Sequence, residues 1–285
     1  MQRRNLKDLI HIRQLDHPES IAVGPQGEAY TTGTGGQVYR INLEKNIGEQ
    51  FASTAPRRLL GQAVDAGGNL YCADCDTGRV IRLTPDGKES LYATGPGGLR
   101  FLCPNYPAFD RQGNLYLSDS GDWSHQINGA IYKISPSGAV ERWYPDPVDT
   151  PNAIALDADE RFLYVVETLG SSIVRIAIQS DGTAGALERV VHMPRHLTDG
   201  LALDEQGRLW IGCHRPDAIY IFDLKSRRLE LFAEDWTGAV LRSPTDVAFA
   251  GPNRDILLAA SLNSLTAHRW NNVGARGLRL NHPIL

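Results

Sequence analysis

One pattern of hydrophobic and polar positions recurs along most of the chain. In each copy a short apolar segment ends at an Asp or Gly turn, and a Leu-aromatic pair or a looser equivalent opens a second β-rich segment. The clearest copy covers residues 198–210, with its turn at Asp204. Short segments of this composition bounded by turn residues are typical of strands. The turns begin at Gly24, Asp65, Asp110, Asp157, Asp204 and Gly251.

The spacing between successive turns is 41 to 47 residues, which is the period of a four-stranded propeller blade. Third strands with good alternation are expected at residues 37–41, 79–83, 130–134, 172–176, 218–222 and 265–270. Fourth strands are recognisable at residues 89–93, 140–144 and 229–233. No convincing amphipathic helix is present. The sequence therefore predicts an all-β fold, a six-bladed β-propeller.

The two ends of the chain predict how the ring closes. The sixth copy has little chain left for a fourth strand, whereas residues 9–12 form an apolar segment before the first copy begins. We expect this N-terminal segment to pair onto blade six and cover its open edge. Residues 1–285 would then form a single six-bladed β-propeller domain without a linker.

Composition and charge limit the classes of molecule that the protein is expected to bind. Hydrophobic residues make up 42% and charged residues 22% of the chain, which suits a globular protein with a buried core. The net charge is −4 with Lys and Arg scattered, so nothing favours nucleic acid or an anionic membrane. The N-terminus lacks the apolar run of a secretory signal. We expect a cytoplasmic protein, monomeric or a weak homodimer, with a small-molecule substrate.

The cysteines are not expected to form a disulfide framework. Cys72, Cys75, Cys103 and Cys213 are too few for a disulfide framework in a chain of 285 residues, and a reducing compartment is expected. Cys72 and Cys75 have CxxC spacing, but residues three apart on a strand face opposite sides. We therefore disfavour a redox or zinc site at this pair.

Candidate site residues lie five positions before each turn, at the start of each innermost strand. They are Glu19, Leu60, Asn105, Asn152, Asp199 and Asp246, and five of the six carry a side-chain oxygen. Equivalent positions of the inner strands converge on the axis of a propeller, so these oxygens should meet at one mouth of the channel. Three residues further on, five copies have Ala but blade six has Phe249, so Asp246 is kept only as an additional channel residue.

A set of carboxylates and carboxamides without His or Cys suits a hard cation. We expect one divalent cation, with Ca²⁺ favoured and Mg²⁺, Mn²⁺ or Zn²⁺ as alternatives. Taken singly, each Asp or Asn is also a common turn residue that bonds its local backbone. Covalent serine catalysis is disfavoured because the chain lacks the nucleophile-elbow motif. Loop residues that could contact substrate at the mouth are Arg100, Tyr106, Trp123 and His214.

Three motifs carry a resemblance to a known family. They are Pro18-Glu19 in blade one, residues 151–157 in blade four, and Asp199-Gly200 followed by residues 207–210 in blade five. The chain resembles the regucalcin and gluconolactonase family, also named after senescence marker protein and luciferin-regenerating enzyme. Diisopropylfluorophosphatases and strictosidine-synthase-like propellers are more distant relatives.

The resemblance implies one divalent cation, usually calcium, held in the channel by Glu19, Asn152 and Asp199, with Asn105 near the metal or the substrate. It also implies lactone hydrolysis, in which Asp199 is the candidate general base. Residues 100–107 depart from the sugar-lactonase pattern, so a more apolar substrate is compatible with this blade.

Two other functional classes stay open. One is a non-catalytic propeller in which the metal stabilises the ring and the rim binds a metabolite or protein. The other is related propeller chemistry, such as phosphotriester hydrolysis or a strictosidine-synthase-like condensation, because fold alone does not fix function.

Overall fold

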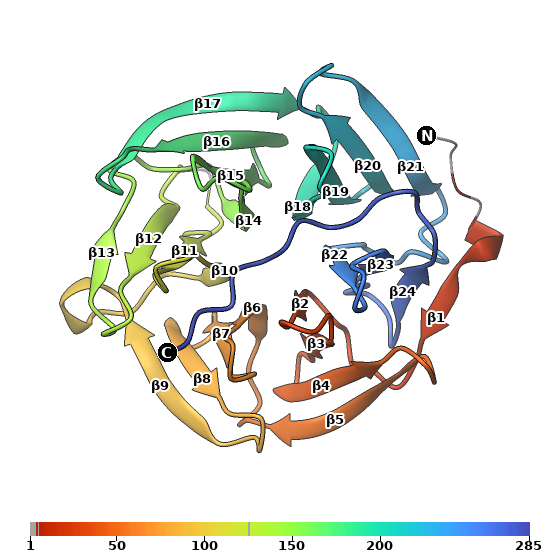
Figure 1. Ribbon diagram of the computed structural model, residues 1–285, viewed down its shortest axis with the longest axis horizontal. Helices are drawn as coiled ribbons and strands as arrows, with labels where there is room; N and C mark the ends of the chain where they lie inside the picture. Colours follow the sequence, from red (N-terminus) through yellow and green to blue (C-terminus); the bar gives the residue numbers. More distant parts are fainter. Residues whose placement is uncertain (1–3, 5, 125) are drawn as a thin grey trace.

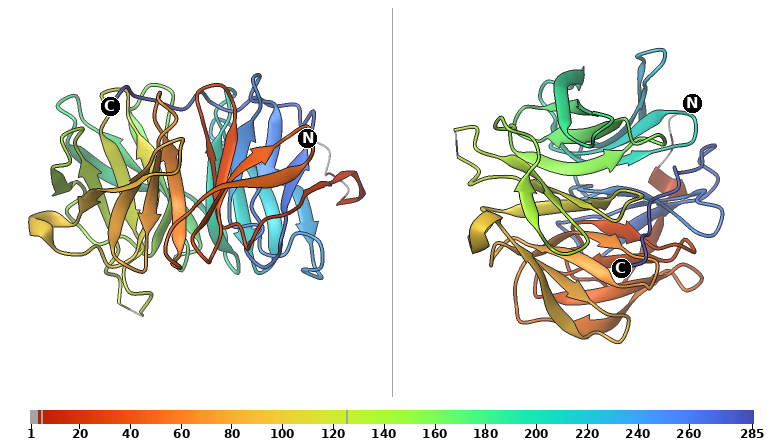
Figure 2. Two further views of the ribbon diagram at one scale, coloured as in Figure 1. Left: turned by 90° about the horizontal axis from the view of Figure 1, so that it is seen from below. Right: turned by 60° about the vertical axis from the view of Figure 1, so that its left-hand side comes forward.

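Six four-stranded antiparallel sheets stand around a central axis in the computed structural model, which describes residues 4, 6–124 and 126–285 (Figure 1). Each sheet is one blade, and its first strand is the innermost. The two further views show a short cylinder with loops at both ends (Figure 2). The sequence prediction of a six-bladed β-propeller is confirmed.

The first three blades are continuous in sequence. Blade one contains β2 (Ile21–Val23), β3 (Ala29–Thr32), β4 (Gln37–Asn42) and β5 (Ile47–Ser53). Blade two contains β6 (Leu59–Val64), β7 (Leu70–Asp74), β8 (Arg79–Leu83) and β9 (Glu89–Thr94). Blade three contains β10 (Pro104–Phe109), β11 (Leu115–Asp119), β12 (Ala130–Ile134) and β13 (Val140–Arg142).

The remaining blades use the rest of the chain and its N-terminal segment. Blade four contains β14 (Pro151–Leu156), β15 (Phe162–Glu167), β16 (Ser172–Ile178) and β17 (Ala184–His192). Blade five contains β18 (Leu197–Leu203), β19 (Arg208–His214), β20 (Asp217–Asp223) and β21 (Leu229–Asp235). Blade six contains β22 (Val247–Ala250), β23 (Ile256–Ala259), β24 (Ala267–Trp270) and β1 (Ile10–Ile12). Two short 3-10 helices are η1 (Leu6–Asp8) and η2 (Pro96–Gly98).

The ring closes through its N-terminal strand, as the sequence predicts. β1 pairs antiparallel with β24, with Ile10 opposite Arg269 and Ile12 opposite Ala267. The central residue His11 faces His268, and their rings meet edge to face at 5.3 Å. A strand from the start of the chain therefore covers the outer edge of the last blade.

Small residues line the axis where the inner strands crowd together. Five alanines each pair with an aromatic residue of the second strand, namely Ala22 with Tyr30, Ala63 with Tyr71, Ala108 with Tyr116, Ala155 with Tyr164 and Ala202 with Trp210. In blade six Phe249 occupies this place, opposite Leu257. Phe249 packs against Trp210 of blade five, whereas Ala248 faces blade one, so the inner strand of blade six is shifted by one residue. Asp246 therefore does not occupy the place that Asp199 has in blade five, and it lies beside Gly200 instead.

The C-terminal strap, residues 277–283, runs across one end of the channel (Figures 1 and 2). The Leu278 N–H donates to the carbonyl of Leu203 at 2.8 Å, and Asn281 Nδ2 donates to that of Phe109 at 2.9 Å. His282 Nδ1 lies 2.8 Å from the Val64 carbonyl. The strap is thus bonded to the inner strands of blades five, three and two. Beneath it an axial cavity of about 120 Å³ is lined mainly by aliphatic side chains and alanines.

One pair of cysteines is bonded, which the expectation of a reducing compartment did not foresee. Cys75 and Cys103 form a disulfide, whereas Cys72 and Cys213 are free and buried. This bond could not be predicted from the sequence, because Cys75 and Cys103 are 28 residues apart and belong to neighbouring blades. Only the arrangement of the blades in the ring brings them together. In the described residues, no helix has the length and apolar character needed to cross a bilayer.

Candidate functional site

Local irregularities in the inner strands display the candidate residues. The pairing register of β18 shifts between Thr198 and Leu201, where Asp199 lies. The same shift occurs between Pro104 and Pro107 in β10 and between Pro151 and Ile154 in β14, around Asn105 and Asn152. A bulge of this kind redirects side chains and is frequent beside binding sites. Three blades therefore present their polar residue through the same deformation.

A cavity of about 240 Å³, the mouth pocket, opens at the end of the channel opposite the C-terminal strap. All four residues predicted at the metal line it: Glu19, Asn105, Asn152 and Asp199. Two of the predicted substrate-contacting residues, Trp123 and His214, line it as well. These six residues, which are distant in sequence, come from four blades and share one pocket.

Three side-chain oxygens in the mouth pocket lack partners. Glu19 Oε2, Asn105 Oδ1 and Asp199 Oδ1 are buried and accept no hydrogen bond from any described residue. Buried polar atoms are nearly always paired, because an unpaired one carries the full cost of its lost hydration. Three such acceptors around one cavity therefore favour a positively charged or hydrogen-bond-donating ligand.

Hydroxyl groups at the ends of the second strands fix the two amides. Asn105 Nδ2 donates to Ser120 Oγ at 2.9 Å, which leaves its oxygen as the unpaired atom. Asn152 Nδ2 donates to Thr168 Oγ1 at 3.2 Å. Sequence reasoning missed Ser120 and Thr168, although both directly follow an acidic residue at the end of a second strand.

His214 is placed against Asp199. Its Nε2 lies 3.0 Å from Asp199 Oδ2, at the end of the strand that pairs with β18. The sequence suggested a substrate contact for this histidine, and the structure adds a carboxylate partner to that prediction. One oxygen of Asp199 is thereby engaged, while the other is unpaired.

Burial and like charge act together on the carboxylates. Burial raises the pKa of Glu19 well above its usual value, and the neighbouring Asp199 and Asp246 carboxylates raise it further. Burial also raises the pKa of Asp199, although contacts with His214 and Asn152 oppose the shift. Such a crowded acidic site gains from any bound group that brings positive charge.

Asp246 and Tyr106 lie outside the mouth pocket. The Asp246 carboxylate accepts hydrogen bonds from the backbone N–H groups of Ile21 and Val247, both at 2.8 Å. Tyr106 donates its hydroxyl to Asp246 Oδ2 at 3.3 Å and lines the axial cavity. Burial raises the pKa of Asp246 to about 8. Through these hydrogen bonds Asp246 connects blade six to blade one, which is a structural role.

Arg100 also lies outside the mouth pocket, on an exposed loop. Trp123 lines the pocket and is 47% exposed, so its ring is open to a ligand. The rest of the pocket wall combines five leucines with five polar residues: Leu59, Leu60, Leu169, Leu197 and Leu262, and His17, Thr32, Thr34, Arg58 and Thr168. The described residues contain no group of three or more His, Cys, Asp or Glu side chains that could hold a metal. Two of the four converging residues, Asn105 and Asn152, are amides.

Comparisons with known proteins point to one family. Residues 90–263 match the SMP-30/gluconolactonase/LRE-like region, and residues 6–41 match the N-terminal part of strictosidine-synthase-like proteins. The chain is 24% identical over 242 residues to lactonase drp35 of Staphylococcus saprophyticus, covering 81% of this chain and 74% of the relative. Over 196 residues it is 26% identical to lactonase drp35 of Staphylococcus aureus, covering 66% of this chain and 60% of the relative.

Solved structures share the same architecture. A gluconolactonase from Xanthomonas campestris superposes with a TM-score of 0.78 at 20% identity, covering 92% of this chain and 89% of the other. A calcium-binding protein, regucalcin, from Agrobacterium tumefaciens superposes with a TM-score of 0.77 at 17% identity, covering 96% and 97%.

Proposed function

Because this chain belongs to the SMP-30/gluconolactonase/LRE-like family, we propose that it is a lactone hydrolase that works with one divalent cation, Ca²⁺ in the first place. The cation ligands are Glu19, Asn152 and Asp199, and Asn105 contacts either the cation or the substrate. The relatives named lactonase drp35 support the reaction class.

The observation that carries this proposal is the set of unpaired buried oxygens of Glu19, Asn105 and Asp199 around the mouth pocket. Carboxylate and amide oxygens are the ligands that Ca²⁺ prefers, and two carboxylates balance its charge. The residues present therefore fit a hard divalent cation. When bound, such a cation polarises a carbonyl group and stabilises the negative charge that develops on its oxygen.

The protein side chains supply the acid-base chemistry. Asp199 accepts the proton of the attacking water, whose oxygen adds to the lactone carbonyl carbon. The ring C–O bond then breaks, and the proton passes to the departing alkoxide, which leaves a hydroxy acid. His214 holds Asp199 through Oδ2 so that the opposite carboxylate oxygen faces the pocket. The raised pKa of Asp199 suits this exchange, since a stronger base takes the water proton more readily.

The pocket wall favours a lactone with an apolar substituent. Leu60, Leu169 and Leu197 give the pocket an apolar surface beside its polar residues. Trp123 adds a partly exposed aromatic surface. Burial of apolar surface then contributes to binding, at about 25 cal/mol per Å².

The test is turnover across a panel of sugar, alkyl-substituted and aromatic lactones, with Ca²⁺ and with a chelator. We expect hydrolysis with Ca²⁺ that is lost on chelation and restored by Ca²⁺. Asp199→Ala should abolish turnover while the variant stays folded by circular dichroism. Full activity in Asp199→Ala would sink the mechanism, and no turnover of any lactone in the presence of Ca²⁺ would argue for a non-catalytic propeller.

A further inference from the structure

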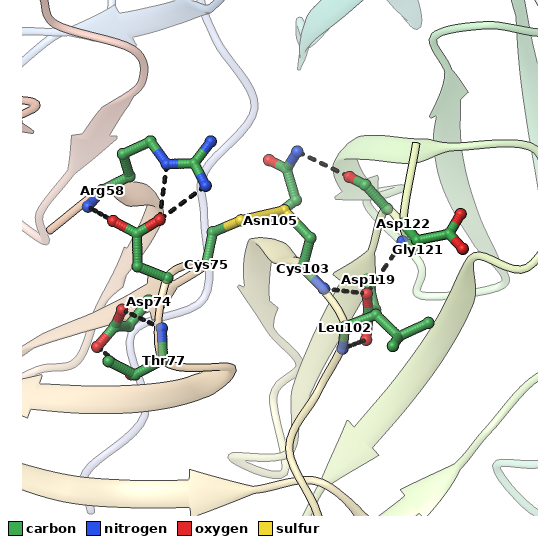
Figure 3. Close-up of a disulfide and its surroundings, with 12 residues drawn as sticks. Arg58, Asp74, Cys75, Thr77, Leu102, Cys103, Asn105, Asp119, Gly121 and Asp122 are labelled. Carbon is green, nitrogen blue, oxygen red and sulfur yellow. Dashed lines mark hydrogen bonds and ion pairs between the residues drawn. A yellow bond between two sulfur atoms is a disulfide. The ribbon is translucent and has the colours of Figure 1, made fainter. Parts of the chain in front are cut away.

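The Cys75–Cys103 disulfide lies beside the mouth pocket and joins two blades. Cys75 follows β7 of blade two, and Cys103 precedes β10 of blade three and lines the pocket. Asn105 is two residues beyond Cys103 on the same segment, and Figure 3 shows its side chain next to the disulfide. The bond is therefore adjacent to a residue that the proposed function places at the cation or substrate.

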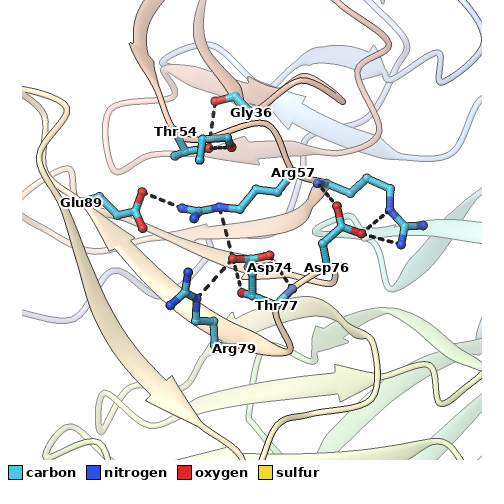
Figure 4. Close-up of polar contacts among 10 residues, drawn as sticks. Gly36, Thr54, Arg57, Asp74, Asp76, Thr77, Arg79 and Glu89 are labelled. Atoms are coloured by element: carbon cyan, nitrogen blue, oxygen red, sulfur yellow. Dashed lines mark hydrogen bonds and ion pairs between the residues drawn. The ribbon is translucent and has the colours of Figure 1, made fainter.

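The blade-two end of the disulfide is firmly anchored. Asp74, which precedes Cys75, is fully buried and forms an ion pair with Arg57 at 3.2 Å (Figure 4). Arg57 also pairs with Glu89 at 2.6 Å, and Asp74 accepts a hydrogen bond from the Thr77 N–H at 3.1 Å. The turn that contains Cys75 is thus fixed by the ion pair and the hydrogen bond of Asp74.

The blade-three end leads directly to Asn105. Asp119 accepts hydrogen bonds from the N–H groups of Leu102 at 2.8 Å and Cys103 at 2.7 Å. Ser120, the next residue, donates its N–H to the Cys103 carbonyl at 2.9 Å, and its hydroxyl accepts from Asn105 Nδ2 at 2.9 Å. A displacement of Cys103 would therefore move the partner that orients the Asn105 amide.

The segment before Cys103 contains only the short helix η2, which two backbone hydrogen bonds hold, from Gly98 to Gly95 and from Leu99 to Pro96. Residues 96–100 are exposed, and the segment includes the consecutive glycines Gly97 and Gly98, both with positive φ. Phe101 is buried and its N–H donates to the Gly78 carbonyl at 3.0 Å. Glycine-rich loops carry high conformational entropy, so a covalent tie at the end of this loop restricts it strongly.

We propose that the Cys75–Cys103 disulfide is a positioning element for Asn105, and that its reduction weakens ligand binding in the mouth pocket. This inference rests on the proposed function for the identity of the ligands. The reaction is thiol-disulfide exchange with a dithiol, in which the Cys75–Cys103 bond breaks, both cysteines become thiols and the dithiol is oxidised to a disulfide. The site would then respond to the redox state of its surroundings.

The test compares the oxidised protein, the protein reduced with dithiothreitol and the Cys75→Ala/Cys103→Ala double variant. Thiol titration after denaturation should find the two free cysteines in the oxidised protein and all four after reduction. Ca²⁺ affinity, measured from the Ca²⁺ dependence of the melting temperature, should fall by about ten-fold on reduction. The double variant should match the reduced protein and ignore dithiothreitol.

Two further variants serve as a cysteine control and as a test of the role of Asn105. Cys72→Ala, which removes a buried cysteine from the same blade, should keep the response to dithiothreitol. Asn105→Ala should weaken Ca²⁺ or substrate binding and show little additional loss on reduction, because the positioned group is already absent. KM should change more than kcat if the disulfide acts through binding geometry.

Equal Ca²⁺ affinity and equal KM before and after reduction would overturn the proposal, as would four free thiols in the untreated protein. A redox-dependent Ca²⁺ affinity without hydrolysis of any lactone would leave the positioning role standing and remove the proposed reaction. The two failures are therefore distinguishable.

Discussion

His214 Nε2 lies 3.0 Å from Asp199 Oδ2, whereas Asp199 Oδ1 has no partner among the described residues. The two oxygens of one buried carboxylate therefore have different surroundings. The histidine fixes the rotation of the carboxylate, and the unpaired oxygen is left for the pocket. Interactions of this kind orient ligating groups and tune their basicity.

We predict that His214→Ala lowers kcat/KM for the best lactone by about 10–100-fold. The Asp199 carboxylate would lose its orienting partner and turn more freely. His214→Gln should lose less, because an amide N–H can donate to the same oxygen. Steady-state kinetics of both variants check this, and unchanged kinetics in His214→Ala would remove the histidine from the site chemistry.

The stabilisation that Ca²⁺ gives should increase with pH. Burial raises the pKa of Glu19 and Asp199 above their usual values of 4.5 and 3.8. Without a cation, the folded protein therefore keeps protons that the unfolded chain releases, and this stabilising contribution is lost as pH rises through the folded pKa values. Ca²⁺ needs the ionised carboxylates and displaces those protons.

The rise in melting temperature on adding saturating Ca²⁺ should thus be larger at about pH 8 than at about pH 5. Glu19→Gln should reduce both the rise and its dependence on pH. A Ca²⁺ effect that is independent of pH in the unmodified protein would contradict the assignment of these carboxylates as ligands.

Gly200→Ala should destabilise the protein. A Cβ atom on Gly200 would lie 2.3 Å from the Cα of Asp246, which is backbone and cannot rotate away. Relief requires the inner strands of blades five and six to separate, at a cost of about 1–3 kcal/mol. Gly67→Ala is the matched control, because its closest neighbour is the side-chain nitrogen of Asn69 at 3.1 Å. Chemical denaturation of both variants measures the difference.

The repeat made the ring and its mouth predictable, whereas the partners of each site residue were not. Equivalent positions before each turn located Glu19, Asn105, Asn152 and Asp199, because propeller symmetry converts sequence period into spatial convergence. The contact between His214 and Asp199 depends on strand register and on one side-chain conformation. The Cys75–Cys103 bond joins loops whose paths are set by packing rather than by the repeat. Neither leaves a periodic signal.

Acid should loosen the closure of the ring at His268. This residue is fully buried opposite His11, its Nε2 lies 3.0 Å from the Leu241 carbonyl, and burial lowers its pKa from 6.5 to about 4. Between these two pKa values, His268 is therefore protonated in the unfolded chain and neutral in the folded protein. The contribution of His268 to the free energy of unfolding is fully present above its usual pKa of 6.5. It is lost as the pH falls toward 4, and the total loss is about 3 kcal/mol.

His268→Gln should reduce the loss of melting temperature between about pH 7 and about pH 4.5, because its amide has no proton to gain in this range. His11→Gln is the comparison, because this neighbour is exposed and contributes less than burial to the low pKa of His268. Its variant should keep most of the pH dependence of the unmodified protein. If His268→Gln behaved like His11→Gln, another group would be responsible for acid sensitivity.

The C-terminal strap covers one end of the channel and leaves the mouth pocket as the opening at the other end. Residues 277–283 cover the end opposite the mouth pocket and bond to three inner strands, so we expect substrate to enter at the mouth. The hydroxy acid formed from it should leave by the same opening. Arrival and departure then exclude each other, so the speed with which product vacates the mouth sets an upper limit on the turnover rate.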